Sequence, residues 1–269
     1  MRFESIILIL VVTLQGVVSP AANAVELTIA YDVRESFPNI IGNGTNIESP
    51  PGISLDILNE VAFQLNIDIK FVRYPILRIW YLMIKGDIDA AFIFSLTEER
   101  KNAAVYPMTD INTLDSRRRM ARLDYHLYKL KESPIEWDGK NIIGLDGPVG
   151  IGRGNSIGKD LELMNIPVSI AKSVRHNVKK LIAKRITVIA EQNRPVNHIL
   201  TGMGISNVER LDIPLSTKDY YLVFSKKFSA SHPGLTENIW NTIGLVRDEI
   251  TQQAMPRYRI PLAPSSPEA

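Results

Sequence analysis

Residues 86–100 read GDIDAAFIFSLTEER, and this stretch decides the fold. Its residues 89–94 are almost continuously apolar, which is typical of a strand buried on both faces of a parallel sheet. Thr97 then favours a helix start, with Arg100 in the first turn. Free backbone N–H groups at such a start attract anions, and open α/β folds bind ligands at this edge of the sheet. The stretch therefore predicts a small-carboxylate site at Ser95 and Arg100. The alternative is a buried strand followed by a solvated helix.

The first residues of the chain predict export. Residues 6–18 are apolar and follow Arg2, and the triplet Ala-Asn-Ala at 22–24 has the small-x-small pattern that signal peptidase requires. A membrane anchor is the alternative, but polar residues and Pro20 interrupt a run shorter than the ~20 apolar residues that span a bilayer. We therefore expect residues 1–24 to be a cleaved signal peptide and the mature protein to be periplasmic. The chain contains no cysteine, which excludes disulfides and a lipid-modified cysteine.

The charge balance argues against nucleic acid as a partner. The formal net charge is +2, and the basic residues are scattered except for Arg117-Arg118-Arg119. We interpret that triplet as the solvated start of a helix or strand. The remaining composition is that of an ordinary globular protein.

Hydrophobic periodicity predicts the order β-α-β-α-β twice along the chain. In the first half, the pattern predicts strands at 27–31, 67–72 and 88–94, a helix capped by Asp56, and a helix at 76–85 stopped by Gly86. In the second half, it predicts strands at 149–152, 168–171 and 186–190 and helices at 156–164 and 174–183. Each half therefore reads as one α/β lobe.

Two connections join the predicted lobes. Residues 109–115 form a polar link, residues 221–224 read as a strand returning to the first lobe, and residues 235–247 read as a closing amphipathic helix. We expect a doubly wound α/β fold with two hinge crossings and a ligand in the cleft between the lobes. The expected organisation is a signal peptide at 1–24, lobe 1 at 25–112, lobe 2 at 113–220, a return to lobe 1 at 221–260, and a flexible tail at 261–269.

Several motifs, in this order and at these spacings, resemble the family 3 extracellular solute-binding proteins, the periplasmic receptors of polar amino-acid ABC transporters. The motifs are GISLDI at 52–57, GDIDAA at 86–91, SLTEER at 95–100, VGIGRGNS at 149–156 and LVFSK at 222–226. The resemblance covers nearly the whole mature chain. It implies a periplasmic-binding-protein (type II) fold, in which two lobes close over the ligand like a Venus flytrap.

The resemblance also implies a carboxylate site. Arg100 falls on the family's carboxylate-binding arginine and Ser95 on one of its serines, while Asn155 and Ser156 fall on the second-lobe loop that donates to the same carboxylate. The chemistry agrees, because a guanidinium binds a planar carboxylate through two parallel hydrogen bonds and a closed cleft removes the water that would screen them.

The chain departs from the family where the ligand's amine would bind. The register of the fifth strand brings Gln192 to the position of the family's acid, with Glu191 beside it, and Thr187 stands where that strand usually has an aspartate. Another family serine is replaced by Ile93. Either Glu191 binds the amine or the ligand is not an ordinary amino acid. The remaining alternative is that Glu191 and Gln192 form a solvated strand end.

Other candidates for the pocket wall are aromatic or basic. Tyr31, Phe37 and Phe94 each face either the cleft or the core. Arg78 either closes over the ligand or lies on the surface, and we interpret Trp80 as a packing residue.

No pattern predicts an enzyme, a metal or a cofactor. The four histidines have no metal-ligand spacing, and the glycine-rich run at 150–154 lacks the third glycine of a dinucleotide fingerprint. A dehydratase built on the same fold is a remaining alternative that only an assay separates. We expect a monomer that binds a small carboxylate or amino acid and presents its lobe surfaces to a membrane permease. The alternative is a sensing module for a membrane signalling receptor.

Overall fold

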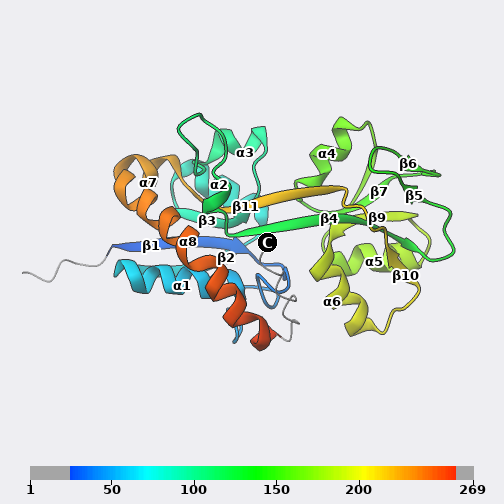
Figure 1. Cartoon of the computed structure of the whole chain (residues 1–269), viewed down its shortest axis with the longest axis horizontal. Coiled ribbons are helices and arrows are strands. Elements are labelled where there is room, and N and C mark those ends of the chain that lie inside the picture. The colour runs from blue at the N-terminus through cyan, green and yellow to red at the C-terminus, as the bar shows by residue number, and fades with distance from the viewer. Residues whose placement is uncertain (1–24, 259–269) are drawn as a thin grey trace, which may run out of the picture.

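The structure is a computed structural model that describes residues 25–258, and it is an α/β chain in two lobes (Figure 1). The predicted signal peptide and the predicted tail at 261–269 lie outside the described residues. The first lobe contains β1 (Glu26–Asp32), α1 (Ile53–Leu65), β2 (Asp68–Tyr74), α2 (Ile76–Lys85), β3 (Ala90–Phe94), α3 (Glu98–Ala103), α7 (Lys226–Ser231), α8 (Pro233–Ala254) and the 3-10 turn η2 (Met255–Tyr258).

The 3-10 turn η1 (Ser116–Arg118) leads into the second lobe, which contains β4 (Ala121–Leu130), β5 (Glu136–Trp137), β6 (Ile142–Ile143), β7 (Val149–Gly152), α4 (Ile157–Leu163), β8 (Val168–Ala171), α5 (Val174–Ile182), β9 (Val188–Gln192), α6 (Asn193–Met203) and β10 (Val208–Arg210). The long strand β11 (Ser216–Phe224) leads back. Within residues 25–258, no helix combines the length and the apolar character needed to cross a bilayer.

One strand belongs to the sheets of both lobes. The strand order is β2-β1-β3-β11-β4-β9-β7-β8, with β10 also paired to β4. Residues 216–220 of β11 pair antiparallel with β4, and its residues 221–224 pair antiparallel with β3. Figure 1 shows β4 and β11 running together from one lobe to the other. Movement of one lobe relative to the other must therefore be absorbed close to this pair of strands and the link before β4.

Local signals explain where most first-lobe elements begin and end. Gly86, with φ of 68°, ends α2 as predicted, and Thr97 caps α3 by accepting the N–H of Arg100 at 3.2 Å. The prediction that Asp56 caps α1 is wrong, because the helix begins three residues earlier, directly after Gly52. Gly52 has φ of 121° and packs against the backbone of Asn39, so this position requires glycine. The early start also buries Ile53 in the core.

Each lobe buries apolar side chains on both faces of its sheet. In the first lobe, one face of β1 packs Leu27, Ile29 and Tyr31 with residues of α1 and α8. The other face, which includes Ala30, packs with residues of α2 such as Ile79. The second lobe repeats this layering with two further clusters. The carboxyl ends of β1, β3, β7 and β9 lie at the cleft between the two lobes.

Candidate functional site

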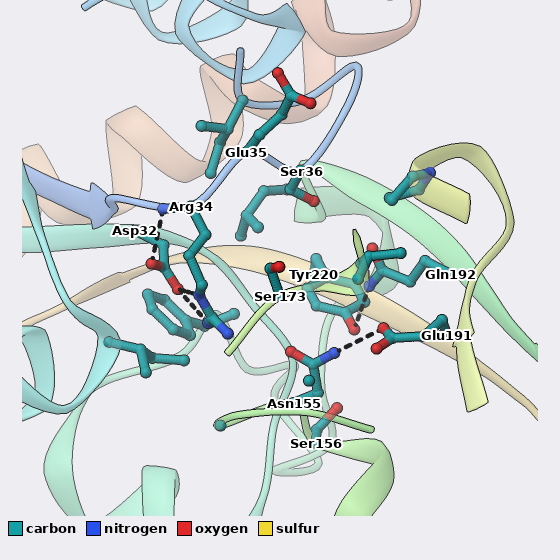
Figure 2. A pocket seen from close by; sticks show the side chains of 18 of the residues that line it. Asp32, Arg34, Glu35, Ser36, Asn155, Ser156, Ser173, Glu191, Gln192 and Tyr220 are labelled. Carbon is teal, nitrogen blue, oxygen red and sulfur yellow. Dashed lines mark hydrogen bonds and ion pairs between the residues drawn. The ribbon is translucent and has the colours of Figure 1, made fainter. Parts of the chain in front are cut away.

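A cavity of about 110 Å³ lies between the lobes. The first lobe contributes the loop after β1, the start of α2, the end of β3 and Arg100, and the second lobe contributes the loop after β7, the start of α5 and the end of β9. Figure 2 shows Asp32 and Arg34 on one side of the cavity and Asn155 and Glu191 on the other. One buried water needs roughly 10–15 Å³ of such space, so this cavity has room for a small solute in place of several waters.

Arg100 is a buried cation on the cavity wall. Its side chain is held by backbone carbonyls: Nη1 donates to the oxygen of Ser95 at 2.8 Å, and Nη2 donates across the cleft to the oxygen of Gly154 at 2.7 Å. The guanidinium also lies over the rings of Trp80 and Phe94, at 5.5 and 5.3 Å. Within residues 25–258 it forms no ion pair with a carboxylate. A buried guanidinium with an uncompensated charge is a strong site for an anion.

Glu191 is a buried acid on the opposite wall. The residue is 1% exposed, and its two carboxylate oxygens accept the amide groups of Asn177 at 2.7 Å and Asn155 at 3.2 Å. Burial raises the pKa of Glu191 to about 7, against the opposing effects of the Asn177 hydrogen bond and the Arg34 charge. In the described part of the chain no cation lies within ion-pair distance of it. A cation brought by a ligand would therefore favour the ionised carboxylate.

Hydroxyl groups connect the two lobes beneath these charges. Ser95 donates to Ser156 at 2.8 Å, and Gln192 donates to the hydroxyl of Tyr220, which donates to Tyr125 at 2.9 Å. Burial raises the pKa of both tyrosine hydroxyls. They therefore remain protonated hydrogen-bond donors at neutral pH.

Seven of the nine predicted residues come together at this site. Phe94, Arg100, Asn155, Ser156, Glu191 and Gln192 line the cavity, and Ser95 is bonded to Ser156 directly behind it. The structure does not support the alternative that Glu191 is a solvated strand end, since it is almost fully buried.

Two predicted residues lie elsewhere. Tyr31 is 1% exposed and stacks on Phe92 in the first-lobe core, with ring centroids 5.0 Å apart. Alternate side chains of a strand point to opposite faces, so Asp32 reaches the cavity and Tyr31 cannot. Arg78 is exposed, and its guanidinium lies over the ring of Tyr74 on the outside of the lobe.

Sequence reasoning missed Asp32 and Arg34. These residues form an ion pair, and Arg34 Nη1 also donates to the oxygen of Arg153 at 2.8 Å across the cleft. Asp32 is the last residue of β1 and Arg34 lies two residues beyond it, and this place at the carboxyl end of a strand is the one sequence signal that could have marked them. Arg34 and Arg100 thus bind neighbouring carbonyls of the same second-lobe loop, and they hold the two lobes together in a closed arrangement.

Ile93 has an unusual backbone conformation at the end of β3. Its φ is 66°, which is rare for a β-branched residue, and the pairing of β3 with β11 is irregular at this point. Ile93 lines the cavity between Phe92 and Phe94. At the position where the family resemblance implies a serine, this chain places an apolar side chain.

Comparison with known proteins places the fold among two-lobed ligand-binding domains. No family model and no curated protein sequence matches this chain. Among solved structures, it is similar to the GluR0 ligand-binding core from Nostoc punctiforme in complex with L-glutamate, with a TM-score of 0.67 and 14% identity over 87% of this chain and 100% of that one.

It is also similar to an ABC uptake transporter substrate-binding protein from Streptococcus pneumoniae with bound histidine, with a TM-score of 0.65 and 16% identity over 87% of this chain and 92% of that one. A histidine kinase sensor domain with similarity to periplasmic binding proteins gives a TM-score of 0.68 and 10% identity over 87% of this chain and 95% of that one. These likenesses confirm the two-lobed, type II periplasmic-binding-protein-like fold that the sequence motifs predicted.

Proposed function

We propose that this chain is an exported solute-binding protein that captures a small carboxylate-bearing solute, an amino acid or a close relative, between its lobes and delivers it to an ABC transporter permease. One observation carries the proposal. The same interlobe cavity holds a buried cation, Arg100, and a buried acid, Glu191, and within residues 25–258 neither has an ion-pair partner of opposite sign. A zwitterion would supply both partners at once.

The energetics are sufficient for useful affinity. Hydrogen bonds to charged groups contribute roughly 1.5–3 kcal/mol each, and micromolar binding corresponds to ~8 kcal/mol. Two N–H groups of Arg100, the hydroxyl groups behind the cavity and Glu191 supply more than two such bonds, before the entropy of association is subtracted. Solved structures similar to this chain include domains with glutamate and with histidine bound, which supports a solute of this class.

A screen of small solutes tests the proposal. Amino acids and other small carboxylates would be added to the purified protein, and the thermal unfolding midpoint measured for each. A ligand at a hundred times its dissociation constant stabilises the protein by roughly 2.7 kcal/mol, which shifts the midpoint by roughly 5–10 °C for a chain of this size. No shift with any amino acid or small carboxylate at millimolar concentration would contradict the proposal.

A second candidate function is sensing without transport. The TM-score with a histidine kinase sensor domain, 0.68, is as high as that with a transport protein, 0.65, and closure of two lobes serves either role. Pull-down of a permease or of a membrane sensor by the liganded protein separates the two. A dehydratase activity would appear as a bound amino acid recovered in altered form, which mass spectrometry of the ligand after incubation detects.

A further inference from the structure

The cavity at Arg100 and Glu191 continues outward into a second, larger cavity. The outer cavity measures about 260 Å³ and shares four lining residues with the inner one: Glu35, Ser173, Val174 and Pro195. In Figure 2 the side chain of Glu35 points away from Asn155 and Glu191, with Ser173 between them. A ligand held in the inner cavity therefore has an outlet for its side chain, lined by Val174 and Pro195, the hydroxyl of Ser173 and the carboxylate of Glu35.

Both lobes form the outer cavity. Phe37 of the first lobe stacks on His198 of α6, with ring centroids 4.2 Å apart and planes 9° from parallel. Asn43 lines it from the first lobe, and Arg175 and Ile199 line it from the second. Lobe closure therefore assembles the outer cavity together with the inner one.

One acid, Glu35, and one arginine, Arg175, line the outer cavity, and they differ in their contacts. Its acid, Glu35, is already engaged: one carboxylate oxygen accepts the N–H of Gly42 at 3.0 Å, and the other lies 3.6 Å from Nε2 of His198. The guanidinium of Arg175, by contrast, makes no hydrogen bond and no ion pair within residues 25–258, and the residue is exposed at the cavity wall.

We propose that the ligand is an amino acid with an extended side chain that ends in a carboxylate, and that Arg175 binds this distal carboxylate. The inference rests on the proposed function, because the α-amino and α-carboxylate groups occupy the inner cavity at Glu191 and Arg100. The apolar stem of the side chain passes Val174 and Pro195. Arg175 is then a specificity-determining residue, since its planar guanidinium pairs with a carboxylate through two parallel bonds.

A homologous series of ligands tests this. Calorimetry would measure the affinity of L-aspartate, L-glutamate, L-2-aminoadipate and L-2-aminopimelate, and of uncharged L-norvaline and L-norleucine. We expect affinity among the diacids to rise with chain length until the carboxylate reaches Arg175, and the best diacid to bind at least tenfold more tightly than the uncharged amino acid of similar length. Arg175→Ala should remove this preference and leave the uncharged ligands unchanged, and Arg175→Glu should shift the preference to L-lysine.

Arg78→Ala is the matched control, because it removes an exposed arginine that lines neither cavity. It should leave the whole series unchanged. If Arg175→Ala binds the diacids as tightly as the unmodified protein does, or if uncharged amino acids bind as tightly as diacids, the inference is wrong while the proposed function stands. Absence of binding by every amino acid tested would overturn both.

Discussion

The carboxyl group of Glu191 is buried between two asparagine amides, and burial raises its pKa to about 7 from 4.5. Between about pH 4.5 and 7, the carboxyl group of Glu191 is therefore protonated in the folded protein and ionised in the unfolded chain. By linkage, the free energy of unfolding must fall as the pH rises through this window and then level off.

Glu191→Gln should remove this pH dependence. Relative to the variant, the ligand-free protein should lose on the order of 3 kcal/mol of stability between pH 4.5 and 8. Urea unfolding of both proteins across this range measures the difference. Parallel stability curves would show that Glu191 titrates as an exposed glutamate does.

Ligand affinity should depend on the same proton. A ligand amine needs the ionised carboxylate of Glu191, so affinity should weaken below about pH 7 by up to about tenfold per pH unit. Glu191→Gln should bind more weakly and without this slope, whereas Gln192→Ala should keep it. If Gln192→Ala removes the pH dependence of affinity and Glu191→Gln keeps it, the amine binds at Gln192, the position that the family resemblance indicates. Calorimetry between pH 5 and 9 separates the two outcomes.

At the scale of single elements, α3 positions Arg100, the residue on which we propose that binding depends. This helix has six residues, Glu98–Ala103, and its cap is the hydroxyl of Thr97 on the N–H of Arg100. A helix this short is not stable by propensity alone, so the cap and the carbonyl contacts of Arg100 determine where the guanidinium lies.

Thr97→Ala should cost about 1 kcal/mol of stability and lower ligand affinity severalfold. Ser225→Ala is the control, because Ser225 caps α7 in the same lobe by accepting the N–H of Phe228 at 3.1 Å. It should lose similar stability and keep full affinity. Equal affinity of the two variants would mean that the cap does not position Arg100. Thermal unfolding and calorimetry on both variants give the answer.

The elements also show how far the sequence could predict this fold. The first lobe was predictable because its signals are local: an apolar run for β3, Gly86 at the end of α2 and a threonine before α3. Strand β4 was missed because half of it alternates charged and apolar residues on a partly exposed ribbon. Helix α6 was missed because the residue before it, Gln192, is not a typical helix cap, and its side chain makes no capping hydrogen bond.

The site was predictable to the extent that motifs carry it. Ser95, Arg100, Asn155 and Ser156 were placed by their position in those motifs, but Arg34 was not, since its partner carbonyl at Arg153 is 119 residues away. Whether Tyr31 lies in the core or in the cleft depends on which face of β1 packs against α1 and α8, and only the tertiary structure shows that. Long-range contacts between lobes are the part that no local pattern determines.

At the scale of the whole molecule, the proposed binding requires the lobes to approach closely. Gly154, with φ of 74°, lies against Ile76 of the other lobe, and a β-carbon there would come within 2.9 Å of that side chain. Gly204 has a similar φ of 65° with open space around it. Alanine variants at the two glycines therefore distinguish the effect of backbone strain, which both share, from steric interference with lobe closure, which only Gly154 has.

Gly154→Ala and Gly204→Ala should each lose roughly 1–2 kcal/mol of stability from left-handed backbone strain. Only Gly154→Ala should also lose ligand affinity, by at least several-fold, because the closed arrangement must open to admit the new methyl group. Calorimetry on both variants measures this. Equal affinity would mean that the ligand does not need the contact between Gly154 and Ile76.

The most direct measurement is calorimetric titration of the best ligand from the amino-acid screen into the unmodified protein, Arg100→Ala and Arg78→Ala. We predict that Arg100→Ala lowers affinity by roughly a hundredfold or more, as expected when a buried pair of charged hydrogen bonds is lost, while Arg78→Ala binds like the unmodified protein. Circular dichroism should show both variants folded. Undiminished binding by folded Arg100→Ala would contradict the claim that a carboxylate binds at this guanidinium between the lobes.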